Sequence, residues 1–173
     1  LADLLGLRYI ASSVSLGDID KALGPDDLQL IARTKDGYVY ENTRAFPRVM
    51  FATQSLQANF DTLMDNGQWP EVDFNTQVIL QTPPDTRQRA PGRVRITSYN
   101  NTSVAIDVDS PDGGWVVLND IWQPWWFASL DGADTPLLRA NAIVRAVAVP
   151  PGRHIVMFTF EPVRGAIKQL SGG

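Results

Sequence analysis

Apolar and polar residues alternate through much of the second half of the chain. Within residues 93–97, valine and isoleucine alternate with arginine and threonine, and the same period of two recurs at 104–109 after an Asn-Asn turn. This period is typical of strands that bury one face and expose the other. Further apolar runs follow, separated by glycine- and proline-rich turns, at 115–122, 127–130, 142–149 and 154–160. The pattern predicts an antiparallel β-sandwich or jelly roll over residues 93–173.

Residues 1–81 have a more mixed pattern, typical of an α+β part. Helices are expected as a short amphipathic segment at 1–7, one turn at 18–23 and a helical turn at 60–65. Extended segments are expected at 7–11, on both sides of an Asp36-Gly37 hairpin turn, at 48–53 and at 74–80. TPPDTRQRAPG, residues 82–92, contains three prolines and a glycine and is predicted to be a linker. We therefore expect a mainly β fold with a few short helices, in one compact domain.

The composition excludes several classes of function. The chain has 173 residues, no cysteine and one histidine, and its formal net charge is −4. Without cysteine it can have no disulfide, thiolate metal site or cysteine nucleophile. Without a basic footprint it is not expected to bind nucleic acid. A single histidine cannot build a His-rich metal site, and no glycine-rich phosphate loop is present, so we expect neither a metal nor a cofactor.

WQPWWFASLDG, residues 122–132, places three tryptophans within five positions. One interpretation is that the indoles fill the space between two sheets. The other is that an exposed indole stacks on a sugar ring while neighbouring polar groups bind its hydroxyls. Trp122 and Trp126 are expected in the core, Trp125 fits either interpretation, and one indole of the adjacent pair is predicted to be largely exposed. The polar groups available to such a platform are Asp131, Asn119 and Asp120.

Two turns and a basic run complete the candidate chemistry. Asp131-Gly132 is predicted to form a type I′ turn, which needs a positive φ at both residues. His154 follows a Pro-Pro-Gly turn, has no partner identifiable by spacing, and is expected at a strand surface or edge. A basic run either faces anionic lipid headgroups or belongs to a solvated linker, and it consists of Arg87, Arg89, Arg93 and Arg95.

Four segments of the chain carry a resemblance to a known family. They are LGLRYI at 5–10, YVYENTRAFPRVMF at 38–51, WVVLNDIWQPWWFASLDG at 115–132 and NAIVRAVAVPPGRHIVMFTFEP at 141–162. In this order they resemble the extracytoplasmic C-terminal region of the bacterial YfhO-like family of multi-pass membrane proteins. Two positions depart from the family pattern: Trp125 stands where a glycine is usual, and Phe127 where a lysine is often found.

The resemblance implies a non-catalytic domain on the periplasmic face of the inner membrane, carried by a glycosyltransferase-like membrane portion. Its partners would be that membrane portion and a glycan or lipid-linked sugar acceptor. Within the matching signature, Asn42 and Arg48 are candidate ligand contacts, although Arg48 could equally pair with Glu41. The alternative is a module that binds another envelope protein through exposed aromatics. An independent hydrolase is a weaker alternative, because no acid–base pair has a persuasive spacing.

Overall fold

The computed structural model describes residues 3, 6–19, 21 and 27–171, and the chain forms two compact units, Leu1–Arg48 and Val49–Gly173. This boundary differs from the division expected at 82–92. The reason is that β4 (Val49–Ala52), which precedes that segment, pairs with β9 (Gly114–Ile121), which follows it. Residues 82–92 therefore connect elements within the second unit.

The first unit contains a three-stranded antiparallel sheet in the order β1–β3–β2. Its elements are β1 (Tyr9–Ser12), α1 (Leu16–Ile19), β2 (Gln29–Thr34) and β3 (Gly37–Glu41). The turn at Asp36 joins β2 to β3, which confirms the predicted hairpin. The helix expected at 1–7 falls largely outside the described residues, as does the end of the helix expected at 18–23.

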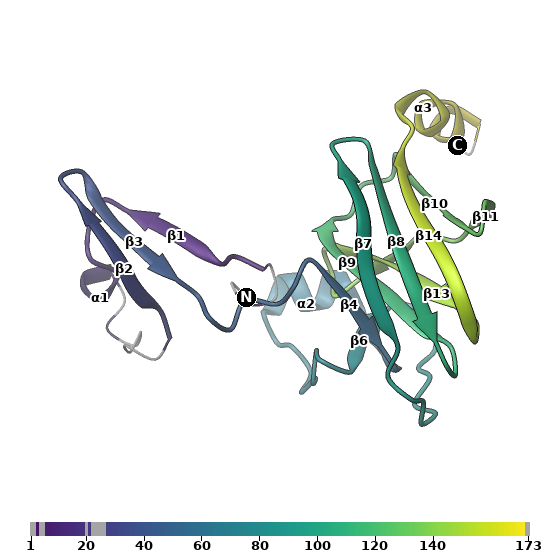
Figure 1. Ribbon diagram of the computed structural model, residues 1–173, viewed down its shortest axis with the longest axis horizontal. Coiled ribbons are helices and arrows are strands. Elements are labelled where there is room, and N and C mark those ends of the chain that lie inside the picture. The colour runs from purple at the N-terminus through teal and green to yellow at the C-terminus, as the bar shows by residue number, and fades with distance from the viewer. Residues whose placement is uncertain (1–2, 4–5, 20, 22–26, 172–173) are drawn as a thin grey trace. The chain divides into compact units, whose positions relative to one another are not determined.

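The second unit is built on two antiparallel sheets that pack face to face (Figure 1). The five-stranded sheet, in the order β11–β10–β14–β8–β7, consists of β7 (Arg93–Asn100), β8 (Ser103–Ser110), β10 (Trp126–Leu130), β11 (Ala133–Thr135) and β14 (Gly152–Phe160). The four-stranded sheet, in the order β12–β13–β9–β4, adds β12 (Leu138–Ala140) and β13 (Val144–Val149) to β9 and β4. The predicted mainly β, sandwich-like fold is confirmed.

Strand pairing in this unit is nested, as is typical of a jelly roll. β8 pairs with β14, β9 with β13, and β10 with β11, so the chain from β8 to β14 forms one long hairpin folded across both sheets. β8 directs Ile106 and Val108 between the sheets, where they join a core that includes Val116 and Leu118 of β9. The period of two in the sequence therefore corresponds to the buried face of the sandwich.

The second unit also has a smaller core that the sequence pattern did not predict. Its elements are β5 (Gln54–Gln57), α2 (Phe60–Asn66) and β6 (Gln77–Leu80). β5 and β6 pair in parallel, and α2 lies in the connection between them and packs Phe60 and Leu63 with Ile79. The helical turn expected at 60–65 is confirmed, and Gly67, whose φ is 66°, caps the C-terminal end of the helix after Asn66.

The last element, α3 (Pro162–Ser171), lies at one end of the second unit (Figure 1). Proline suits the first position of a helix, because the N–H that it lacks would have no partner there. The helix docks through Gly165, which is buried and lies against the indole of Trp125. Trp125 Nε1 also donates a hydrogen bond to Gln169 Oε1 at 3.2 Å. The indole of Trp125 is therefore the surface on which α3 packs.

Replacing Gly165 by alanine tests the packing of α3 against Trp125. The added Cβ would lie 2.7 Å from Trp125 Cγ, too close for van der Waals contact. We expect Gly165→Ala to lower the free energy of unfolding by about 1–3 kcal/mol, although alanine favours helices by about 1 kcal/mol over glycine. Urea denaturation followed by tryptophan fluorescence measures the difference. Gly17→Ala is the matched control, because its Cβ would have no neighbour nearer than 3.9 Å; equal stability of the two variants would contradict the close contact.

Candidate functional site

The three tryptophans of the aromatic block lie in different surroundings. Trp126 is partly buried and packs against the sandwich core, as predicted, and Trp122 is half-buried with the Arg139 guanidinium 5.9 Å from its ring centroid. Trp125 is 38% exposed. It is the more exposed indole of the adjacent pair, but Gly165 and Gln169 of α3 lie against it. Helix α3 therefore covers part of the Trp125 ring, and the rest of the ring is exposed.

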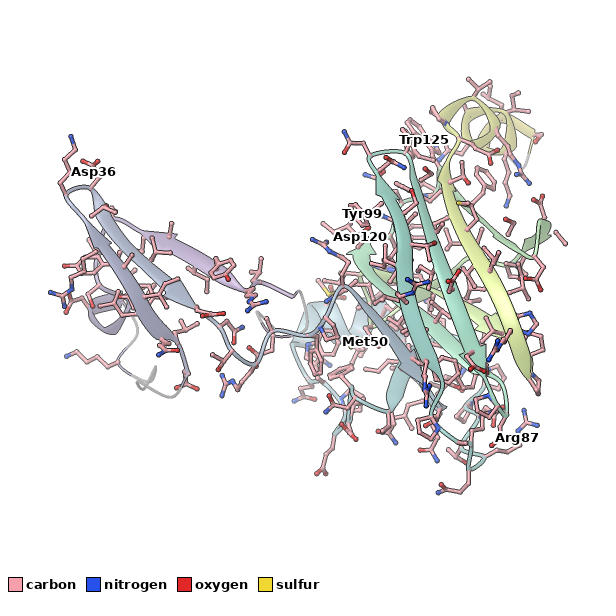
Figure 2. All side chains as sticks on the ribbon, in the orientation of Figure 1. Asp36, Met50, Arg87, Tyr99, Asp120 and Trp125 are labelled. Atoms are coloured by element: carbon pink, nitrogen blue, oxygen red, sulfur yellow. The ribbon has the colours of Figure 1, made fainter. Side chains whose placement is uncertain are left out.

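Neither Asn119 nor Asp120 stands on an exposed platform. Asn119 is buried, and the Asp120 carboxylate accepts hydrogen bonds from Tyr99 Oη at 3.0 and 3.1 Å (Figure 2). Asp120 Oδ2 lies 3.6 Å from Nη2 of Arg145, which is buried and stacks on Trp126, with its Cζ 3.8 Å from the ring centroid. Burial lowers the pKa of Arg145, and the negative charge of Asp120 opposes that shift. Both sheets contribute to this cluster, which consequently ties them together.

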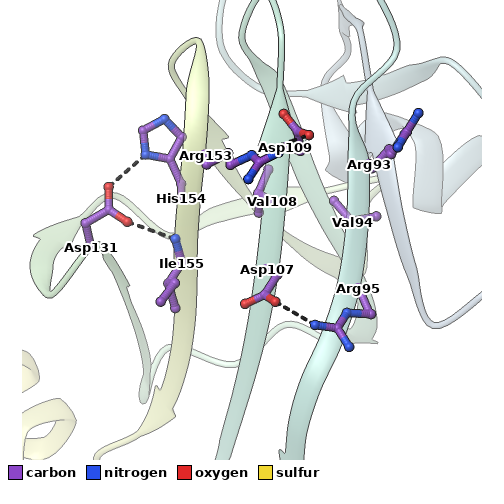
Figure 3. Close-up of a pocket in the computed structure, with 10 residues that line it drawn as sticks. All are labelled: Arg93, Val94, Arg95, Asp107, Val108, Asp109, Asp131, Arg153, His154 and Ile155. Atoms are coloured by element: carbon purple, nitrogen blue, oxygen red, sulfur yellow. Dashed lines mark hydrogen bonds and ion pairs between the residues drawn. The ribbon is translucent and has the colours of Figure 1, made fainter.

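Asp131 is paired with the only histidine of the chain. The predicted type I′ turn is confirmed by φ values of 52° at Asp131 and 84° at Gly132. From this turn Asp131 Oδ2 contacts His154 Nδ1 at 2.7 Å, and its Oδ1 accepts a hydrogen bond from the Ile155 backbone N–H at 2.8 Å (Figure 3). Spacing along the chain did not indicate this pair, because 23 residues separate its members.

The pair anchors two turns rather than forming a catalytic dyad. His154 Nε2 faces the carbonyl oxygen of Pro151 at 3.4 Å, so both ring nitrogens are directed at protein atoms. The hydrogen bond that His154 donates to Asp131 raises the pKa of His154, and the same bond lowers the pKa of Asp131. Asp131 also lies at the opposite end of β10 from Trp126, about 16 Å away at the usual strand rise. These two candidates therefore cannot contact one sugar ring together.

The outer face of β7, β8 and β14 carries a shallow depression of about 590 Å³ beside this pair (Figure 3). Its charges are arranged in cross-strand pairs. Arg95 Nη2 lies 2.9 Å from Asp107 Oδ2, and Arg153 Nε lies 3.8 Å from Asp109 Oδ2. Opposite charges on neighbouring strands neutralise each other, which leaves this face with little net charge.

The four arginines of the basic run do not form one surface. Arg87 and Arg89 each lie 2.6 Å from the carboxylate of Asp85, and their hydrogen bonds hold the pKa of Asp85 well below its usual range. The Arg89 side chain is only 8% exposed and lies over the Trp115 ring, so it cannot reach a headgroup. Arg93 and Arg95 lie on β7, and only Arg93 has no ion pair among the described residues.

The two candidates from the first unit have separate surroundings. Asn42 is buried; its Nδ2 donates to Asp3 Oδ1 at 2.7 Å, and its Oδ1 accepts from the Arg44 backbone N–H at 3.0 Å. The amide of Asn42 is therefore used in a structural turn. Arg48 is exposed, and Glu41, the carboxylate considered for it, lies 3.0 Å from Arg8.

A cleft of about 810 Å³ lies between α3 and the aromatic block. Its walls include the rings of Trp122, Trp126 and Phe127, the amides of Gln123 and Gln169, and the cationic side chains of Arg164 and Lys168. The Arg164 Cζ lies 4.1 Å and the Lys168 Nζ 6.0 Å from the centroid of the Phe127 ring. The sequence pattern missed this cleft because it did not predict α3. The helical spacing of apolar residues after Pro162 was the signal that could have indicated it.

Comparisons with known proteins add no family. No family model matches the chain, and no curated protein or solved structure matches it at a significant level. Among the described residues, no group of three or more His, Cys, Asp or Glu side chains is placed to hold a metal ion. Within that same part of the chain, no helix combines the length and apolar character needed to cross a membrane.

The Asp131–His154 pair predicts a pH dependence. Because the folded state raises the pKa of His154, its contribution to stability is full below 6.5 and is lost as the pH rises through the raised value. The single imidazole gives one NMR titration, which we expect to lie above 6.5 in the wild type and to fall in Asp131→Asn. Asparagine tolerates the positive φ of this turn, so the variant keeps the backbone. An unchanged titration in Asp131→Asn would contradict the pair.

The Asp120 cluster predicts a structural rather than a ligand-binding role. Asp120→Ala leaves Arg145 buried without its carboxylate and is expected to lower the free energy of unfolding by about 3–5 kcal/mol. Tyr99→Phe, the milder control, removes one hydroxyl and is expected to cost about 1 kcal/mol. Chemical denaturation measures both. Wild-type stability in Asp120→Ala would show that the carboxylate does not hold the two sheets together.

Proposed function

We propose that this chain is a non-catalytic binding domain that holds a glycan, or the sugar of a lipid-linked acceptor, in the cleft beneath α3. We further propose that it is displayed on the extracytoplasmic face of the bacterial inner membrane by the multi-pass portion of a glycosyltransferase-like protein. The second proposal rests on the four segments that resemble the YfhO-like family. The first rests on one observation, the aromatic cleft of about 810 Å³.

The chemistry of the cleft suits a sugar. Its volume lies within the roughly 300–1,000 Å³ typical of small-molecule sites. The Trp122 ring, and the Phe127 ring on the side that Arg164 does not cover, can pack against the C–H face of a pyranose ring. Gln123 and Gln169 supply donors and acceptors for hydroxyl groups, and an amide can serve as either. This combination of ring faces and amides is of the same chemical kind as the platform considered from the sequence, but Trp125, Asn119, Asp120 and Asp131 are not among the residues that line it.

The polar pairs outside the cleft favour binding over catalysis. Asp131 and His154 contact each other and backbone atoms of neighbouring turns. Asp120 is hydrogen-bonded to Tyr99 and lies beside a buried guanidinium. A general base needs a free acceptor within reach of a substrate proton, and each of these groups is directed at the protein itself.

A module that binds another envelope protein is the second candidate. It is favoured by α3, whose exposed apolar side chains are Val163 at 74%, Ile167 at 61% and Leu170 at 88%. Their spacing places them along one side of the helix, away from Gly165. The only charged side chains on α3 are Arg164 and Lys168, so the fitting partner would have an apolar groove with acidic edges. Leu170→Gln would abolish capture of such a partner and leave glycan binding unchanged.

Glycan binding by the whole chain tests the first candidate. We expect saturable binding on a glycan array, weakened about tenfold or more in Phe127→Leu, because the smaller side chain removes a ring face from the cleft. Tyr9→Leu makes the same kind of change at an exposed aromatic of the first unit and is the matched control. Circular dichroism and denaturation midpoints establish that both variants fold. Absence of binding to every glycan, or equal binding by Phe127→Leu, would overturn this function.

A further inference from the structure

The lining of the cleft beneath α3 differs in charge from the rest of the protein. The chain has a net charge of −4, with 19 acidic and 15 basic residues. The residues that line the cleft nevertheless include two cations, Arg164 and Lys168, and no carboxylate. A concave, partly apolar wall concentrates the field of the charges that it carries. The cleft is therefore a local positive site in an acidic protein.

The two cations have different surroundings. Arg164 donates hydrogen bonds to Asp134 and to Glu161, so its charge is largely compensated by carboxylates at the rim. Lys168 forms no ion pair with any described carboxylate, and its Nζ lies 6.0 Å from the centroid of the Phe127 ring. A cation in the last turn of a helix is stabilised by the helix dipole, which accounts for a lysine at this position. The helix dipole explains a positive charge at this position, but it does not explain why the Lys168 ammonium group lies over the aromatic wall of the cleft.

We infer that the ligand of the cleft is an anionic sugar, whose ring lies on the aromatic wall and whose carboxylate or phosphate is bound by Lys168. This inference rests on the proposed function and names the ligand class of the same site. An ammonium group donates up to three hydrogen bonds, and charge-assisted bonds to an anion are stronger than neutral ones. Arg164 lies over the same Phe127 ring, but Asp134 and Glu161 compensate its charge, so Lys168 is the cation available to the anion. The amides of Gln123 and Gln169 bind the remaining hydroxyls.

Two matched pairs of probes test the inference on the whole chain: galactose oligomers against galacturonate oligomers of equal length, and galactose against galactose 1-phosphate. In calorimetry at low salt we expect an anionic probe to bind about tenfold or more tightly than the neutral one, with the difference shrinking as salt screens the charge. Lys168→Gln should remove that preference and keep the binding of neutral oligomers. Arg93→Gln removes one positive charge from the outer face of β7 and should keep the preference.

Each outcome separates the inference from the function on which it rests. Preference for galacturonate identifies an acidic polysaccharide as the source of the anion, and preference for galactose 1-phosphate identifies a phosphorylated acceptor; both support the inference. Equal affinity for neutral and anionic probes would overturn the anionic ligand and keep the cleft as a glycan site. Binding of none of the probes, together with a silent glycan array, would overturn the proposed function itself. If Arg93→Gln loses the preference for anionic probes as well as Lys168→Gln, the preference comes from the net charge of the protein, and the role of Lys168 is overturned.

Discussion

The contact between the Trp125 indole and the backbone of Gly165 determines how α3 sits on the second unit. Glycine allows a helix backbone to approach an aromatic ring more closely than any other residue does. At this separation Arg164 reaches to 4.1 Å from the Phe127 ring centroid, and Lys168 lies over the same ring. The same orientation turns the apolar side chains of α3 toward the solvent. The cleft and the exposed apolar stripe are therefore two consequences of one packing contact.

Elsewhere in the second unit, charges are arranged so that they neutralise one another. Asp85 binds two arginines, Asp107 faces Arg95 across neighbouring strands, and Asp120 lies beside the buried guanidinium of Arg145. Such pairs satisfy charges that would otherwise be costly to bury or would repel along a sheet. A charge that is already paired with an opposite charge attracts a charged ligand only weakly. The same comparison draws attention to Lys168, whose ammonium group is compensated by no described carboxylate.

The sequence predicted best those elements whose pattern is local. Alternation identified β7 and β8, and the Asp131-Gly132 pair identified a turn, because period and positive φ are properties of a few adjacent residues. The hairpin at Asp36-Gly37 was also identified, but its turn residues are Lys35 and Asp36, because Gly37 pairs with Thr34. The division at 82–92 could not be corrected locally, because it depends on the pairing of β4 with β9 across that segment. The parallel pairing of β5 with β6 could not be predicted from a local pattern either, because each strand has only four residues. Pro162 marks the first position of α3, although a proline after a strand equally favours a break in structure.

The candidate site shows the same division between local and distant information. Asn119, Asp120, Trp126 and Asp131 are close in sequence, but β9 and β10 belong to different sheets, and Asp131 lies at the far end of β10. Proximity along the chain was therefore a poor guide to a shared ligand. The pairing of β10 with β14 gives a better one, because it places the start of β14 beside the end of β10 and so brings His154 to Asp131. Strand pairing does not predict the cleft, because one wall of the cleft belongs to α3, which follows the last strand. The positive charge of the cleft can be inferred only when it is known that Gly165 lies against Trp125, because this contact places Arg164 and Lys168 in the cleft wall.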